Sequence, residues 1–131
     1  MTICPLCNIK EHDNETIHVE GDEFYILDTK DKKGHEFRVM ICFKWHDIVP
    51  YGYKDYLFDY FLDWLYNHAP CDTVCVLEDV MSNIPGHFHV VASDWAGDDI
   101  DQMHRTPHVC IETKVGEERR LNNPQHLSCL T

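Results

Sequence analysis

The chain has 131 residues, of which 44% are hydrophobic and 26% are charged, so it has the apolar content to bury one core and is not a disordered chain. No apolar run reaches the roughly 20 residues needed to span a bilayer, and the first residues lack the order of a signal peptide. A formal net charge of −12 argues against a broad positive surface for an extended nucleic acid. We therefore expect a single cytoplasmic domain over residues 1–131 that does not enter a membrane.

A Cys-x-x-Cys motif formed by Cys4 and Cys7 lies close to the start of the sequence. The seven cysteines are an odd number and no export signal precedes them, which favours reduced thiols over a disulfide framework. Two thiolates at this spacing can bind one tetrahedral metal ion. Redox chemistry is the alternative, but a thioredoxin-type motif is expected after a strand and at the start of a helix. We therefore predict a metal site that further ligands complete.

Three short strands are predicted after this motif, over residues 16–19, 24–28 and 36–43, because apolar and β-branched residues gather there between turn-forming residues. The third strand ends just before His46. A histidine at a strand end is commonly only solvated. In combination with the cysteine pair, however, His46 becomes the natural third metal ligand.

One helix is predicted over residues 53–68, where apolar residues recur at helical spacing and acidic residues occupy the other face. Gly52 precedes this helix, and Ala69-Pro70 ends it. A buried strand over residues 73–77 follows. We expect it to pair with residues 87–93 as an antiparallel hairpin.

The last part of the chain gives a weaker pattern. Residues 107–113 have the composition of one further strand. From Gly116 onward the sequence is charged and irregular, which predicts a surface tail. We therefore expect the core of the domain in about residues 4–95, with residues 96–131 as an extension to which the pattern assigns no role.

Two histidines, His87 and His89, lie two residues apart in a run with strand character. Residues i and i+2 of a strand project from the same face, so both imidazoles are aimed at one point. Turn residues precede the pair and apolar residues follow it, which places it where a loop enters a buried strand. A lone His-x-His is also compatible with two solvated histidines, so its interpretation depends on the rest of the chain.

The motifs follow one another in a definite order. Along the chain come the Cys-x-x-Cys, Leu27-Asp28 at a strand end, Gly34-His35, an apolar strand before His46, a helix, and a connector containing Asn83 that leads into His-x-His. This order resembles the histidine-triad (HIT) superfamily, and particularly its galactose-1-phosphate uridylyltransferase branch. The stretch 82–93 is similar to that branch's active strand, Ser-Asn-Pro-His-Pro-His-x-Gln-Val-Trp-Ala-Ser.

The resemblance implies an α+β fold, in which an antiparallel sheet of about five strands packs against a helix and carries an N-terminal Cys-x-x-Cys zinc knuckle. Members bind nucleotides or other small phosphate esters, and many form homodimers. The central histidine attacks the α-phosphorus, and water or a second phosphate then takes the nucleotidyl group from the imidazole. By the same resemblance, Asp28 contacts the ribose and Asn83 lies beside the phosphates.

Only two of the three alternating positions of the triad are histidine. In the ungapped register, His87 is the nucleophile and His89 contacts the phosphate. Pro85 then occupies the position where zinc-bearing relatives place a ligand. In a register shifted by two residues, His87 is the fourth zinc ligand and His89 is the nucleophile, while Val91 takes the third position. Sequence similarity favours the first register, and a complete ligand set favours the second.

Two functions are therefore compatible with the sequence. The first is an HIT-type nucleotide hydrolase or nucleotidyltransferase that uses a histidine nucleophile and a structural zinc ion. The second is a catalytically inactive protein that keeps the fold and the zinc but only binds a nucleotide or a protein partner. The missing third histidine keeps the second function open.

Overall fold

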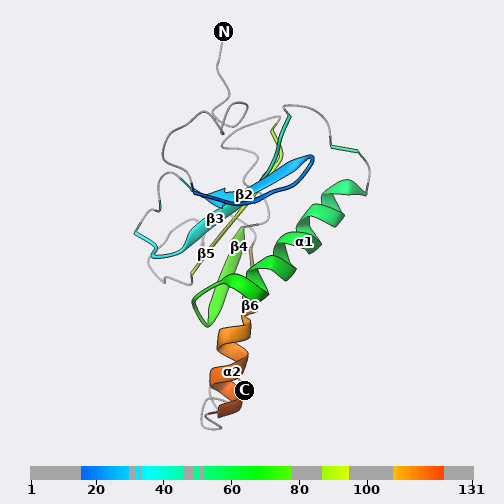
Figure 1. Cartoon of the computed structure of the whole chain (residues 1–131). Helices are drawn as coiled ribbons and strands as arrows, with labels where there is room; N and C mark the ends of the chain where they lie inside the picture. The colour runs from blue at the N-terminus through cyan, green and yellow to red at the C-terminus, as the bar shows by residue number, and fades with distance from the viewer. Residues whose placement is uncertain are drawn as a thin grey trace.

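The computed structural model describes residues 16–29, 32, 34–45, 49–50, 52–77, 87–94 and 108–122. Six strands and two helices lie in these ranges (Figure 1). In chain order they are β1 (Ile17–Glu20), β2 (Phe24–Asp28), β3 (Arg38–Phe43), α1 (Tyr53–His68), β4 (Thr73–Leu77), β5 (His89–Asp94), β6 (His108–Glu112) and α2 (Lys114–Asn122). The predicted α+β class is confirmed, with six antiparallel strands where about five were expected.

The six strands form one sheet in the order β1-β2-β3-β5-β4-β6, and every neighbouring pair is antiparallel. The predicted pairing of residues 73–77 with 87–93 is confirmed, since β4 pairs with β5. β5 inserts between β3 and β4, so the strand that carries His89 is central in the sheet. At the edge formed by β1, the pairing with β2 is irregular between Ile17 and Val19.

The main core lies between α1 and one face of the sheet, which we call the helix face (Figure 1). Alternate residues of the strands point to this face because successive strand side chains project to opposite sides. Complete burial of a large apolar side chain stabilises the fold by about 1.5–3 kcal/mol. Residues that meet in this core include Ile26, Ile41, Phe61, Leu65, Val76 and Ala92.

The ends of α1 follow from its flanking residues. Gly52 precedes the helix with φ 83°, a left-handed conformation that only glycine adopts readily. Ala69 has an extended conformation, as expected for a residue before a proline. The predicted bounds 53–68 are therefore confirmed. Neither α1 nor α2, the two helices in the part of the chain described, is long and apolar enough to cross a bilayer.

The opposite side of the sheet carries a second, smaller cluster, and we call it the histidine face because His89 belongs to it by strand alternation. Its buried apolar members come from the four strands β2, β3, β4 and β5. They are Leu27, Met40, Cys42, Cys75, Leu77 and Val91. The sheet therefore separates two environments, one filled by α1 and one that contains the histidine of β5.

The expected irregular tail after Gly116 is wrong, because Gly116 lies inside α2. Thr113 caps this helix, since its Oγ1 accepts a hydrogen bond of 3.1 Å from the Gly116 amide and satisfies one donor of the first turn. The Thr113 hydroxyl in turn donates to the backbone carbonyl of Asp72, at 3.1 Å. One buried threonine thus joins the start of α2 to the segment that precedes β4.

Contacts of charged side chains join this strongly polar helix to the rest of the fold. Arg119 pairs with Asp72, and the guanidinium of Arg120 donates to both carboxylate oxygens of Glu112. The hydroxyl of Tyr66, on α1, donates to Glu117. These partners lie far away in the sequence or on another element, so a pattern search along residues 116–122 does not detect them. Residues 108–122 therefore add one strand, β6, and one helix, α2, to the predicted core.

We predict that Gly116→Ala destabilises the protein, although alanine is about 1 kcal/mol better than glycine inside a helix. A Cβ at this position would lie 2.2 Å from the Asp72 carbonyl oxygen, so α2 must move away from β4. We expect a loss of about 1–3 kcal/mol in the free energy of unfolding, measured by urea denaturation. The exposed Glu118→Ala serves as the control, with a change within about 0.5 kcal/mol. A gain in stability for Gly116→Ala would contradict the close approach.

Candidate functional site

His89 opens β5 and faces the histidine face. Its Nδ1 lies 2.8 Å from the backbone carbonyl oxygen of His87. A carbonyl oxygen can only accept a hydrogen bond, so Nδ1 carries the proton and Nε2 carries the lone pair in the neutral ring. In this tautomer the lone pair is on the ring nitrogen further from the chain, which is the nitrogen suited to act as a base, a ligand or a nucleophile.

His87 lies two residues before the start of β5 and is completely buried. Its Nε2 donates to the carbonyl oxygen of Phe43 at 2.5 Å and lies 3.6 Å from the Sγ of Cys42. Nε2 is therefore the protonated nitrogen, and the lone pair of the neutral ring is on Nδ1, beside the ring's attachment to the chain. The neutral rings of the two histidines thus carry their lone pairs on chemically different nitrogens, and only in His89 is it the nitrogen further from the chain.

Cys42 of β3 contacts the ring of His87 and is the strand partner of His89. It is the register partner of His89 and, on its other side, of Tyr25 in β2, so the three residues form a row across neighbouring strands. The backbone bond from Phe43 to Phe88 identifies the next pair along as hydrogen-bonded, so Cys42 and His89 form a non-hydrogen-bonded pair. Side chains are closest in such pairs, with Cα atoms about 4.5 Å apart.

Lys44 supplies a positive charge on the same side of the sheet. Its Nζ lies 4.9 Å from the centroid of the Tyr25 ring and 3.7 Å from a carboxylate oxygen of Glu20. Only about a fifth of its side chain is exposed (19%), and its contacts place the ammonium at the Tyr25 end of the row, two strands away from His89. Its carboxylate partner in this structure is Glu20, which an anionic ligand would have to displace or share.

The residues Cys42 and Lys44 were not predicted as site residues. Strand alternation from Met40 assigns Cys42 to a definite side of β3. However, a single sequence gives no means of knowing that β5 is the neighbour of β3, and only this pairing brings Cys42 to the histidines.

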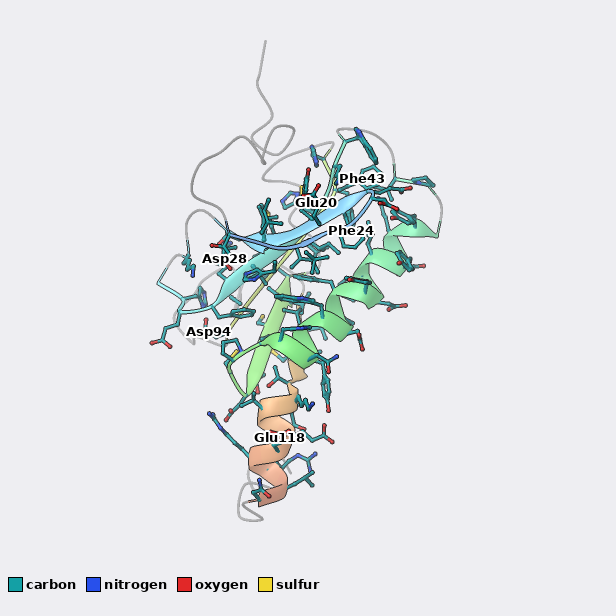
Figure 2. All side chains as sticks on the ribbon, in the orientation of Figure 1. Glu20, Phe24, Asp28, Phe43, Asp94 and Glu118 are labelled. Carbon is teal, nitrogen blue, oxygen red and sulfur yellow. The ribbon has the colours of Figure 1, made fainter. Side chains whose placement is uncertain are left out.

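Asp28, the predicted ribose contact, is not brought to the histidines. Its carboxylate is on the helix face, where Oδ1 lies 2.7 Å from the Nε2 of His18, and the His18 ring contacts Trp64 of α1. It is also at the end of β2 away from Phe24, as Figure 2 shows. The rise of a strand puts it about 10 Å beyond the level of Tyr25. In this structure, Asp28 and His89 belong to opposite faces of the sheet.

His35, which is buried, pairs with the partly exposed Asp94, and the motif Gly34-His35 did not reveal this contact. The Nδ1 of His35 lies 2.8 Å from Oδ1 of Asp94, and the histidine side chain is 1% exposed. The backbone amide of Asp94 also donates to the carbonyl of Phe37 at 3.0 Å. These bonds attach the segment before β3 to the end of β5, which holds the two central strands in one register.

Four predicted site residues, Cys4, Cys7, His46 and Asn83, lie outside the described residues. His87 is the only member of the predicted metal set that the structure describes. Among residues with described positions, no group of three or more histidine, cysteine, aspartate or glutamate side chains is placed to bind a metal ion. The zinc knuckle and its ligands therefore stay predictions.

The arrangement around His89 can support nucleophilic or acid-base chemistry on an anionic substrate, because a tautomerically fixed imidazole and an ammonium share one side of the sheet. Comparisons with protein-family models, curated proteins and solved structures found no match for this chain.

We predict that Cys71 reacts with alkylating reagents only at a higher pH than an ordinary thiol. Burial raises the pKa of Cys71 most, and the negative charge of Asp94 raises it further, since both disfavour the thiolate. The pH midpoint of iodoacetamide reaction at this residue, followed by peptide mass spectrometry, should lie above that of a free cysteine. Asp94→Asn should lower the midpoint in part, whereas the exposed Asp63→Asn should not change it. A midpoint below that of free cysteine would contradict this assignment.

Proposed function

We propose that the chain is an HIT-type nucleotide hydrolase or nucleotidyltransferase that acts through a histidine nucleophile on the α-phosphate of a small phosphate ester. One observation carries the proposal. The hydrogen bond of 2.8 Å from Nδ1 of His89 to the carbonyl of His87 fixes the tautomer in which Nε2 is nucleophilic. Neutral imidazole with one nitrogen held in this way is reactive near pH 7.

This geometry supports the shifted register, with His89 as the nucleophile. His87 is less suited to that role because its Nε2 is engaged as a donor to Phe43 and its lone pair is on the hindered nitrogen. In the shifted register His87 instead serves as the fourth metal ligand, through Nδ1. We keep the ungapped register, with His87 as the nucleophile and His89 on the phosphate, as the alternative.

The proposed reaction has two steps. Nε2 of His89 forms a bond to the α-phosphorus as the bond between phosphorus and the leaving-group oxygen breaks. Water or a second phosphate then attacks the phosphorus and displaces the imidazole. Lys44 would balance charge on the non-bridging oxygens if its ammonium moved from Glu20 and Tyr25 toward His89, along the same side of the sheet.

The substrate class follows from charge. The formal net charge of −12 repels an extended polyanion, whereas one local cation and a histidine pair suffice for a mononucleotide or a similar small ester. Asn83 remains a proposed phosphate contact. Asp28 pairs with His18 on the helix face, whereas His89 belongs to the opposite face of the sheet. We therefore assign Asp28 no role in the reaction.

Zinc is part of the proposal as a structural ion held by Cys4, Cys7, His46 and His87. Thiolate and imidazole donors in this combination fit a tetrahedral zinc ion. The lone pair on Nδ1 of His87 is compatible with this assignment, because its Nε2 is already oriented by a backbone carbonyl. Bound zinc would supply folding free energy.

The second candidate is a catalytically inactive binding protein. One observation favours it: His87 and His89 are both buried, with exposed fractions of 0% and 4%. A nucleophile must reach its substrate, so such burial requires the neighbouring chain to move when a ligand enters. The absence of a third histidine at Val91 points in the same direction.

The labelling test uses an α-labelled nucleotide and detects acid-labile, base-stable label on the protein. We expect His89→Ala to give no labelled enzyme, because the bond to phosphorus cannot form. His87→Ala should still become labelled, more slowly and with loss of zinc, because His87 is proposed as a structural ligand and not as the nucleophile. His68→Ala, at an exposed histidine of α1, is the matched control and should behave like the parent.

The other possible results of the labelling test distinguish the two registers and the inactive alternative. Label on His89→Ala with none on His87→Ala would establish the ungapped register. Equal labelling of both variants and the parent would exclude a role for His-x-His. No label on the parent with any of several nucleotides, while those nucleotides still bind, would establish the inactive alternative.

The metal prediction is tested separately. Gently purified protein should contain about one zinc ion per chain, and Cys4→Ser should lower both the zinc content and the thermal midpoint because the ion contributes folding free energy. His87→Ala should also lose zinc if His87 is the fourth ligand. Cys110→Ser, at an exposed cysteine, serves as the control and should retain the ion. Far less than one zinc ion per chain would end the metal proposal.

A further inference from the structure

Two cysteines face each other across the strands β4 and β6. Cys75 of β4 is the register partner of Cys110 of β6 in an antiparallel ladder. Directly opposite residues in such a ladder point to the same side of the sheet. Because Cys75 belongs to the cluster on the histidine face, Cys110 points to that face as well.

The hydrogen bonds of the ladder define how close these side chains are. The amide of Thr113 donates to the carbonyl of Asp72 at 3.0 Å, and these residues are opposite each other in the continued register of β4 and β6. Hydrogen-bonded and non-hydrogen-bonded pairs alternate along an antiparallel ladder, so Cys75 and Cys110, three positions further, form a non-hydrogen-bonded pair. In such a pair the Cα atoms are about 4.5 Å apart, within the range of about 4.4–6.8 Å that a disulfide spans.

We propose that Cys75 and Cys110 are a redox site that closes a reversible cross-strand disulfide. Both are thiols in this structure. Cys110 is exposed on the edge strand, whereas Cys75 is completely buried, so an oxidant reaches Cys110 first. A neighbouring thiol within bonding distance then resolves the reaction.

The chemistry is a thiol-disulfide exchange with a small disulfide of the glutathione class. The Cys110 thiolate attacks the oxidised reagent, a mixed disulfide forms, and one reduced thiol leaves. The Cys75 thiolate then attacks the Cys110 sulfur and releases the second reduced thiol. The two protein thiols lose two electrons and two protons, and the reagent gains both.

The other described thiols are too far from Cys75 and Cys110 to form a disulfide with either of them. Cys71 packs against the core on the helix face, so it is on the wrong side of the sheet for Cys75 or Cys110. Cys42 is on the correct side, but β5 lies between β3 and β4. Two strand spacings of about 4.8 Å separate it from Cys75, which exceeds the reach of a disulfide.

The cross-link would join the edge strand β6 covalently to β4. It would close a loop of roughly 35 residues, which restricts the unfolded chain and favours the folded state. Because α2 begins just after β6 and is capped by Thr113, the bond would also hold this helix in place. The oxidised protein is therefore expected to be the more stable form.

The test incubates the native full-length chain with oxidised glutathione, blocks the remaining thiols with iodoacetamide, and analyses the peptides by mass spectrometry without reduction. We expect a peptide pair that joins Cys75 to Cys110, lighter by two hydrogen atoms than the sum of its parts. The thermal midpoint should rise by roughly 5 °C or more on oxidation. Reduction with dithiothreitol should reverse both changes.

Cys110→Ser should abolish the cross-link and the thermal shift, whereas Cys71→Ser should leave both intact. Because Cys75 is buried, the fold of reduced Cys75→Ala is first compared with that of the parent by circular dichroism. If the two spectra agree, this variant should form a mixed disulfide at Cys110 without a cross-link. Stable glutathione on Cys110 of the parent, a bond from Cys110 to any other cysteine, or a dimer linked through Cys110 would each overturn the proposal.

Discussion

The backbone pairing of β3 with β5 is the constraint on which the candidate site depends. It sets Cys42 opposite His89 and brings the carbonyl of Phe43 within reach of the His87 ring. A slip of one residue would turn every side chain of β5 to the other side of the sheet. The apolar residues of β5 that face α1 resist such a slip, because their burial is lost if they turn away. The core that stabilises the fold therefore also determines the face of the sheet to which His89 points.

Burial of two imidazoles is costly unless their polar atoms are satisfied. In this protein each ring donates to a backbone carbonyl, of Phe43 for His87 and of His87 for His89. These bonds offset the cost of removing the rings from water and also decide which nitrogen is protonated. The pair formed by His35 and Asp94 follows the same rule on the helix face, where it fixes strand ends. Histidine thus has a catalytic candidate on one face and a structural role on the other.

Local periodicity was sufficient to predict α1 within its observed bounds and the strands β2 and β4, because their apolar pattern and flanking turn residues agree. Local periodicity failed for α2, which has no apolar stripe and whose partners Asp72 and Tyr66 lie far away in the sequence. At the site, alternation correctly placed His87 and His89 near each other. The role of Cys42 and the position of Asp28 could not be predicted, since both depend on strand order and on which side of the sheet α1 covers.

The irregular pairing at β1 has a consequence for how separate molecules meet. An edge strand offers unpaired amide and carbonyl groups to which a strand of another chain can bond. In β1 the register changes between Ile17 and Val19, and the short strand carries the polar residues His18 and Glu20. A change of register twists the strand and interrupts the row of groups that an incoming strand would need. This edge of the sheet is accordingly a poor template for strand addition, and growth into fibrils from β1 is disfavoured.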